Sequence, residues 1–240
     1  MKSFNSNHLV TKTLSSLAIL SAFAIASAQA VVVTWDFNPG NQNANVGSAT
    51  RVYTQSGYNL TVRGYDNVIG GPDTLHELRY KNEDPHGGAF ERGLGLVGTP
   101  SNEFGVNGDG TPTNYLQLDL RSVLSQGFTN GMVQVASLQS GESYTLFGSN
   151  TQGQLGTQIS GTFAGLAFDN DFVAIPNFGD FQFVSIAAVS GRILPVAFQA
   201  TITPIPEMNV LFPIVGLLVA VSSTQILRRR RAAQLSDPKG

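Results

Sequence analysis

The feature that most constrains the fold of this chain is the spacing of its apolar residues, which differs between the middle and the two ends. Between residues 31 and 203, apolar residues come in short alternating runs, and no stretch keeps the i, i+3, i+4 spacing of an amphipathic helix. Gly, Asn, Ser and Thr separate the runs and favour tight turns. The pattern predicts about ten strands in one all-β domain, a single antiparallel β-sandwich of jelly-roll type.

The candidate strands are rich in β-branched and aromatic residues, as half-buried strands are. They cover residues 31–37, 50–55, 58–64, 76–81, 115–120, 132–138, 143–148, 158–163, 172–175, 181–189 and 192–201. Three neighbouring pairs are predicted hairpins: 50–55 with 58–64, 132–138 with 143–148, and 181–189 with 192–201. The first and third have Ser-Gly at their tips, which supplies the positive φ that two-residue hairpin turns need.

The chain has no cysteine, so this domain must be stable through its core alone. The expected core positions are Trp35, Phe37, Leu118, Leu120, Leu146, Phe181, Phe183 and Ile186. Residues 97–114 are expected to form a long loop, and long loops in compact domains are often functional.

The N-terminal segment has the order of a secretory signal peptide. Lys2 and Lys12 precede 13 uncharged residues at positions 14–26, and small residues follow. Ala28 and Ala30 mark an A-x-A cleavage pattern, so residues 1–30 are predicted to form a signal helix. A retained anchor is the alternative, but the apolar run spans only ~20 Å as a helix, less than the ~30 Å bilayer core.

The C-terminal segment combines an apolar run with a basic cluster. Residues 208–227 are 20 residues without a charge, just long enough to span a bilayer as a helix. Arg228, Arg229, Arg230 and Arg231 follow and would stop transfer, holding the last residues in the cytoplasm. This predicts a transmembrane helix over 208–227, which is either a permanent anchor or a signal that is read and removed.

The charge distribution argues against nucleic acid as a partner. Between residues 31 and 206 there are seven Lys and Arg against 14 Asp and Glu, a net charge of −7. Phosphate backbones and anionic lipids attract basic surfaces instead. The arginine cluster has no interleaved aromatic residues and adjoins the apolar run, so it indicates membrane topology.

No motif in the body predicts catalysis, a cofactor or a bound metal. Residues 93–98 match G-x-G-x-x-G, but loop residues follow them where a dinucleotide site needs a helix, so a glycine-rich strand or bulge is expected. His76 and His86 lack the partners of a zinc site, and there is no G-x-S-x-G. Calcium at residues 83–84, 107–110, or Asp169 and Asp171 stays an alternative to turn chemistry.

The tail resembles a PEP-CTERM sorting signal, with Pro206 and Glu207 before the apolar helix and the arginines. Met208 stands where that motif has its second proline, so the signal is a variant. In the body, "RGLGLVGTPSNEFG" at 92–105 and "FQFVSIAAVSGRILPVAFQA" at 181–200 resemble segments of such proteins. The resemblance implies a bacterial exopolysaccharide producer, processing by an exosortase-type membrane enzyme, and a place in the cell envelope or extracellular matrix.

Together these features predict three parts: a signal peptide at 1–30, a β-sandwich ectodomain at 31–203 and a sorting signal at 204–240. The leading hypothesis is an exported, non-enzymatic surface or matrix protein. A glycan-binding module is the alternative, because Trp35 and six tyrosines could stack on sugars. A polysaccharide hydrolase would need two carboxyl groups facing each other in a cleft, about 5–10 Å apart.

Overall fold

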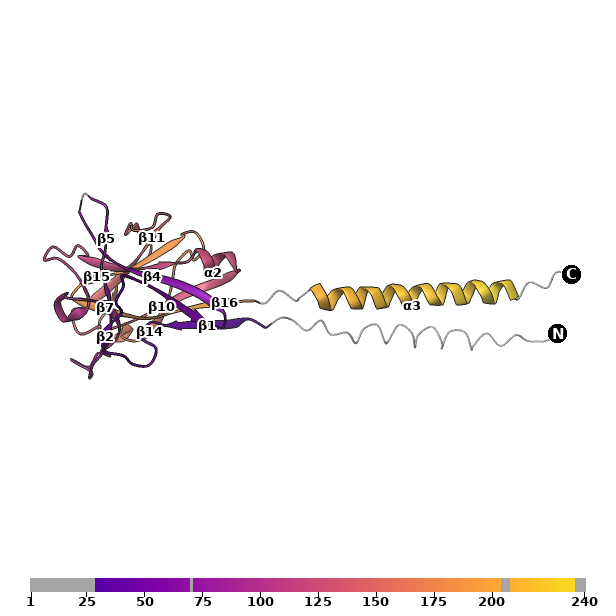
Figure 1. The fold of residues 1–240 in the computed structure, drawn as a ribbon, viewed down its shortest axis with the longest axis horizontal. Coiled ribbons are helices and arrows are strands. Elements are labelled where there is room, and N and C mark those ends of the chain that lie inside the picture. Colours follow the sequence, from indigo (N-terminus) through magenta and orange to yellow (C-terminus); the bar gives the residue numbers. More distant parts are fainter. Residues whose placement is uncertain (1–28, 70, 204–207, 236–240) are drawn as a thin grey trace. The chain divides into compact units, whose positions relative to one another are not determined.

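The computed structural model describes residues 29–69, 71–203 and 208–235. Residues Ala30–Thr203 form one compact unit, which is mostly β with antiparallel sheets arranged like a β-sandwich (Figure 1). The expected all-β antiparallel class is therefore confirmed for this unit.

Every strand pairing in this unit is antiparallel, and the strands form three sheets. The five-stranded sheet holds β1 (Val31–Asp36), β16 (Arg192–Ile202), β10 (Phe128–Ala136) and β14 (Asp171–Ala174) in that order, with β8 (Phe104–Gly105) on β16. The eight-stranded sheet runs β12 (Thr157–Gln158), β11 (Ser143–Ser149), β15 (Phe183–Ser190), β9 (Asn114–Asp119), β4 (Tyr58–Asp66), β3 (Thr50–Gln55), with β13 (Phe163–Ala164) on β11 and β5 (Thr74–Leu75) on β4. The third sheet is β2 (Ala44–Asn45), β6 (Leu78–Asn82), β7 (Arg92–Leu96). Short helical turns are η2 (Pro100–Asn102), α2 (Arg121–Ser125) and η3 (Leu166–Phe168).

One of the three predicted hairpins is present. β3 and β4 pair up to Gln55 opposite Tyr58, and Ser56 and Gly57 both have positive φ, at 52° and 82°. The other two predictions are wrong, because β10 and β16 lie in the five-stranded sheet whereas β11 and β15 lie in the eight-stranded sheet. At Ser190-Gly191 the chain crosses between sheets, so a turn-forming tip does not by itself tell a hairpin from a corner.

The predicted strand over 158–163 is also wrong as one element. Its ends are the two short strands β12 and β13, which both pair with β11. The residues between them form no strand. Here the chain follows one edge of the sheet in two brief contacts, which a continuous alternating pattern does not reveal.

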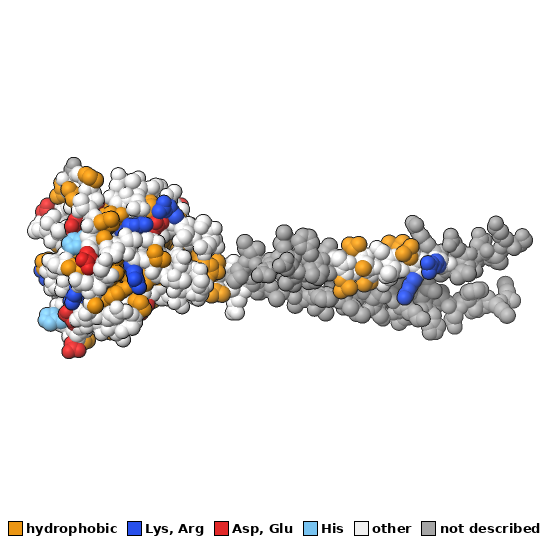
Figure 2. Space-filling model, viewed as in Figure 1, with side chains coloured by type: hydrophobic (Ala, Val, Ile, Leu, Met, Phe, Trp, Pro, Cys, Tyr) orange, Lys and Arg blue, Asp and Glu red, His pale blue; other side chains and the backbone are white. Residues whose placement is uncertain are grey.

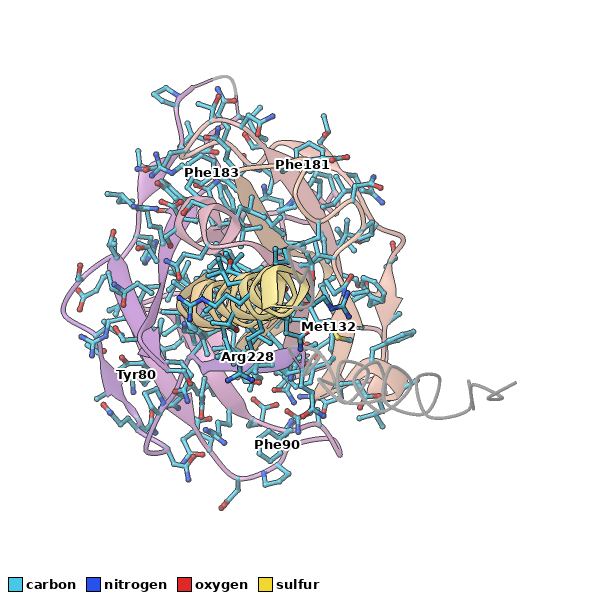
Figure 3. The ribbon with its side chains drawn as sticks, turned by 90° about the vertical axis from the view of Figure 1, so that its right-hand side faces the viewer. Tyr80, Phe90, Met132, Phe181, Phe183 and Arg228 are labelled. Atoms are coloured by element: carbon cyan, nitrogen blue, oxygen red, sulfur yellow. The ribbon has the colours of Figure 1, made fainter. Side chains whose placement is uncertain are left out.

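The core lies between the sheets and is built around one tryptophan. The Trp35 side chain is only 1% exposed, its ring packs against Phe128 and Phe198, and its Nε1 donates to the Tyr58 carbonyl at 3.0 Å. Seven of the eight predicted core residues are buried. Phe181 is half-buried, lying over Gly148, and Figure 3 labels it beside Phe183 at the top of the view.

The central strand β15 is buried on both faces, which explains why its run FVSIAAV hardly alternates in polarity. Ile186 belongs to the core between the sheets. Ala187 points the other way and packs with Tyr65 and Tyr115, next to the half-buried Leu155. Residues 150–156 therefore cover part of the outer surface of the eight-stranded sheet.

The glycine-rich segment 93–98 is mainly the strand β7, as its sequence predicted. A Cβ on Gly93 would come within 2.7 Å of the Pro195 carbonyl oxygen, and one on Gly95 would overlap the carbonyl oxygen of Asn102. These glycines allow β7 to pack closely against β16 and η2. Their role is backbone approach within the fold, because β7 leads into η2 and not into a phosphate-binding helix.

The first and last strands of the sandwich are neighbours. β1 pairs with the C-terminal half of β16, with Val31 opposite Ile202 and Asp36 opposite Ala197 (Figure 1). The chain therefore enters and leaves this unit at the same place. The opposite end of β16 begins at Arg192, ten residue steps and roughly 33 Å away along the strand.

The C-terminal segment contains the helix α3 (Met208–Leu235), which includes the predicted helical range and continues through the four arginines. In the part of the chain that the structure describes, no helix is both long enough and apolar enough to cross a membrane. The transmembrane prediction for 208–227 is therefore not confirmed. The signal helix predicted within residues 1–30 lies almost entirely outside the described residues.

We expect Gly95→Ala to destabilise the sandwich, because the added methyl group would overlap a backbone oxygen that cannot move independently. Overpacking of this kind costs about 1–3 kcal/mol of unfolding free energy. Gly108→Ala is the matched control, because a Cβ at Gly108 meets nothing within 4 Å. Urea unfolding followed by tryptophan fluorescence measures both, and equal midpoints for the two variants would contradict this account of β7.

Candidate functional site

The polar groups that converge at one end of the sandwich come from the β6–β7 hairpin and from the loop that follows it. Lys81 on β6 lies opposite Gly93, and the Glu83 N–H donates to the Glu91 carbonyl at 2.9 Å. Glu103 follows η2 within segment 97–114, the segment predicted to be a functional loop. We call Lys81, Glu91 and Glu103 the carboxylate–lysine cluster.

Lys81 occupies the centre of this cluster. Its Nζ donates to Glu91 Oε2 at 3.0 Å and to Glu103 Oε1, and Glu83 Oε2 lies 3.4 Å away. The side chains of Lys81, Glu91 and Glu103 are 5%, 4% and 5% exposed. Ionised groups this deeply buried persist only where they are paired and hydrogen-bonded, so the three side chains depend on one another.

The two buried glutamates differ in the number of donors that reach them. Glu91 Oε2 accepts a hydrogen bond from Lys81. Its other oxygen, Oε1, accepts hydrogen bonds from the Ser137 hydroxyl at 3.1 Å and from the Gln139 side-chain amide at 3.4 Å. The Glu103 carboxylate accepts a hydrogen bond from Lys81 and from no other described residue. Glu91 is therefore held by several donors and Glu103 by one.

The pKa of Glu103 is raised to about 7, chiefly by burial and also by the nearby Glu91 and Glu142, while the hydrogen bond and charge of Lys81 act to lower it. For Lys81, burial acts to lower the pKa, but the hydrogen bonds to Glu103 and Glu91 outweigh it and raise the pKa overall. The ammonium therefore stays charged, and Glu103 is the member of the cluster that takes up a proton near neutral pH.

The cluster opens into a pocket of about 610 Å³. Its acidic lining residues are Glu83, Asp84, Glu91, Glu103 and Glu142. Its basic residues are Lys81, Arg192 and His86. A second hollow of about 370 Å³ shares Glu103, Glu142 and Arg192 with the first. In Figure 2 the histidine atoms lie toward the left-hand end of the sandwich, among acidic side chains.

This pocket lies at the opposite end of the sandwich from the point where the chain enters and leaves. Arg192, the first residue of β16, lines it, whereas Val31 pairs with Ile202 at the other end of that strand. Arg192 is oriented through Glu142, whose Oε1 accepts its backbone N–H at 3.2 Å and whose Oε2 accepts the Gln139 N–H at 2.8 Å.

The arrangement does not make a ready pair of catalytic carboxyl groups. Glu91 and Glu103 share a pocket, as a hydrolase would require, but Lys81 lies between them and binds both. A glycosidic bond could not occupy the space that the ammonium fills. The cluster can instead hold a proton on Glu103 and offer carboxylate acceptors to a bound group.

Asp169 and the turn at residues 107–110, both considered for metal binding, have other roles. Asp169 accepts the N–H groups of Phe90 and Leu138, tying two loops together. Residues 107–110 form a turn in which Asp109 accepts the Thr111 N–H at 2.9 Å, and this bond lowers the pKa of Asp109. Among residues 29–69, 71–203 and 208–235, no three His, Cys, Asp or Glu side chains are grouped so that they could hold a metal.

The two histidines of the sandwich also make specific contacts. His76 Nδ1 lies 2.8 Å from Asp66 Oδ1 and its Nε2 lies 2.7 Å from the Val97 carbonyl oxygen. Both ring nitrogens face acceptors, so the ring is bound best as an imidazolium. Burial acts to lower the pKa of His76, but these two hydrogen bonds outweigh it and raise the pKa overall. At the pocket, the Gln139 side-chain amide lies 3.1 Å from His86 Nδ1 and hydrogen-bonds to it.

The aromatic residues proposed for sugar stacking are not available for it. Trp35 is buried. Of the six tyrosines, Tyr58 alone is partly exposed, and the other five are buried: Tyr53, Tyr65, Tyr80, Tyr115 and Tyr144. Figure 3 places Tyr80 at the lower left, on the side of the three-stranded sheet. The stacking argument for a glycan-binding module is therefore wrong for Trp35 and for five of the tyrosines.

The predicted sorting residues are mostly beyond what the structure describes. Pro206 and Glu207 lie outside the described residues, as does Ala28, while Ala30 is exposed just before β1. Met208 is the first residue of α3. Arg228, Arg229 and Arg231 are exposed along α3, which also contains Arg230.

No local sequence pattern marks the carboxylate–lysine cluster. A lysine inside a predicted strand is a weak signal, and the three residues are 10 and 12 positions apart without a motif. The β6–β7 pairing and the η2 turn bring them together. No protein-family model matches this chain, and no curated protein matches its sequence significantly.

We expect Glu103→Gln and Glu91→Gln to affect stability differently. The pKa of Glu103 is raised from 4.5 to about 7, so the folded state holds a proton that the unfolded state has lost. Wild-type stability should therefore fall as pH rises from about 4.5 to about 7, and Glu103→Gln should flatten this dependence. Glu91→Gln should cost ~1–3 kcal/mol because it weakens three hydrogen bonds. Urea midpoints at pH 4.5, 6 and 8 test this, and parallel pH profiles for wild type and Glu103→Gln would refute it.

His76 should add a second pH dependence of the same sign. Its pKa is raised above 6.5 in the folded state, so its contribution is fully present below about pH 6.5 and is lost as pH rises through the folded value. NMR titration of the imidazole should give a midpoint above that of an unfolded-chain histidine. His76→Gln should be less stable than wild type at pH 5.5, with a smaller difference at pH 8.5; an equal difference at both would contradict the imidazolium assignment.

Proposed function

We propose that this chain is an exported, non-enzymatic surface protein whose β-sandwich is delivered to the cell envelope or the extracellular matrix. Residues 1–30 act as the export signal and residues 204–240 as a PEP-CTERM-like sorting signal. The sandwich performs a structural or adhesive role outside the cell. Its acidic charge and its lack of disulfides are compatible with that location.

The observation that carries this proposal is the pairing of β1 with β16. Val31 lies opposite Ile202, so both flanking segments attach to one end of the sandwich. The pocket with the carboxylate–lysine cluster lies at the other end of β16. A domain tethered through its C-terminus would thus have its polar loops free to meet other molecules, which supports display at a surface.

The tail supplies the second support. Pro206, Glu207 and Met208 precede an apolar segment and four arginines, an order that resembles a PEP-CTERM signal. In this proposal the apolar segment holds the precursor at the inner membrane with the arginines on the cytoplasmic side. An exosortase-type membrane enzyme recognises the Pro-Glu-Met variant and processes the chain there.

Fractionation of cells expressing an epitope-tagged chain tests the location. The tag fits in the exposed turn at residues 107–110, so that it leaves both signals intact. We expect surface or matrix localisation for the full chain and a changed distribution after deletion of residues 208–240. Deletion of residues 236–240 alone is the control, because it keeps the apolar segment and the arginines. Cytoplasmic retention of the full chain, or unchanged localisation without residues 208–240, would contradict the proposal.

Intact-mass measurement of the mature protein tests the processing. We expect loss of the N-terminal segment up to Ala28 or Ala30 and loss of the C-terminal helix. A Pro206→Ala, Glu207→Ala double variant should keep its tail while still losing its N-terminal segment. A mature wild-type protein with its tail intact would refute exosortase-type processing and favour a permanent anchor.

A further inference from the structure

One oxygen of the carboxylate–lysine cluster lacks a partner. Glu103 Oε1 accepts a hydrogen bond from Lys81, whereas Oε2 accepts none from the described residues. The side chain is only 5% exposed, and Glu103 lines both hollows at this end of the sandwich. Oε2 is not among the fully buried atoms without a partner, so solvent reaches it from the pocket, and a donor on a ligand could take the place of water there.

The other groups of the pocket do not supply that donor. Lys81 has three N–H groups, and three carboxylates surround it. The Glu142 oxygens accept the backbone N–H groups of Gln139 and Arg192. Five acidic residues line the pocket against two permanently charged basic ones. The Arg192 guanidinium also has donors to offer, because among the described residues it makes one bond, to Ser101 Oγ at 3.5 Å. When Glu103 is ionised, the excess charge of the pocket is negative, and Glu103 Oε2 is an acceptor without a protein donor.

We propose that this pocket binds a ligand that carries a primary ammonium group, which donates to Glu103 Oε2 and offsets the excess negative charge. An ammonium has three rotatable donors and needs no fixed coordination shell. A metal ion does need one, and no suitable group of ligands is present among the described residues. The inference concerns the pocket alone and does not depend on where the protein is located.

The size of the pocket narrows the class of ligand. About 610 Å³ is within the usual range for small-molecule sites, and it continues into the adjoining hollow through Glu103 and Arg192. An amino sugar within a short glycan and a linear polyamine both present such a group. Both ligands would donate to Glu103 through a primary ammonium group, and the experiment below distinguishes one from the other.

Isothermal titration calorimetry on the purified full-length protein provides the test. The probes are a glucosamine trimer, an N-acetylglucosamine trimer of the same length, and spermidine. We expect binding of at least one amine probe and none of the N-acetylated trimer, whose amide nitrogens carry no charge. Preference for the glucosamine trimer assigns an amino-sugar ligand, and preference for spermidine assigns a polyamine.

Two variants separate the pocket from general charge attraction. Glu103→Gln keeps the shape of the side chain and the Lys81–Glu91 pair, and it should weaken binding roughly tenfold or more, because a charge-assisted hydrogen bond is lost. Asp180→Asn removes the same charge from an exposed residue that does not line the pocket, and it should leave the affinity within about twofold. Far-UV circular dichroism confirms that both variants are folded.

Several results would overturn the proposal. They are the absence of binding by either amine probe, equal binding of the N-acetylated trimer, wild-type affinity in Glu103→Gln, and an equal loss in Asp180→Asn. None of them bears on export or sorting, which fractionation and intact mass test separately.

Discussion

The antiparallel pairing of β16 with its neighbours is the constraint on which the rest of this structure depends. β16, the last strand of the domain, has 11 residues and pairs with β1, β10 and β8, so the first and last strands are neighbours in one sheet. Its start at Arg192 contributes to the polar pocket, and its end at Ile202 contributes to the chain exit. One strand thus reaches both the end where the chain enters and leaves the domain and the end that holds the polar pocket.

The polar pocket depends on the same strand through packing. β7 approaches β16 so closely at Gly93, and η2 so closely at Gly95, that neither glycine has room for a side chain. This approach brings the β6–β7 hairpin and the η2 turn to one end of the sandwich, where Lys81 meets Glu91 and Glu103. A motif that resembles a nucleotide-binding loop is therefore a packing device, and it supports a site made of carboxylates and one ammonium.

Much of the fold was accessible from local sequence patterns. The strands β1, β3, β4, β9 and β16 were predicted within a few residues, because alternation and Ser-Gly or Asn-rich turns are local signals. The predicted pairings failed at Gln139–Glu142 and Ser190-Gly191, where the chain changes sheets. Turn residues report that the chain reverses or bends, but they carry no information about which sheet receives the next strand.

The sequence by itself determined the all-β class, the acidic body, and the order of an N-terminal apolar segment, a sandwich and a C-terminal basic tail, because composition and periodicity act over short stretches. Only the tertiary structure decided that Trp35 and most tyrosines are interior, and that three charged side chains with no common motif share one buried cluster. Such contacts follow from strand pairing between distant residues, and the free energy of burying a charge depends on neighbours that lie far away along the chain.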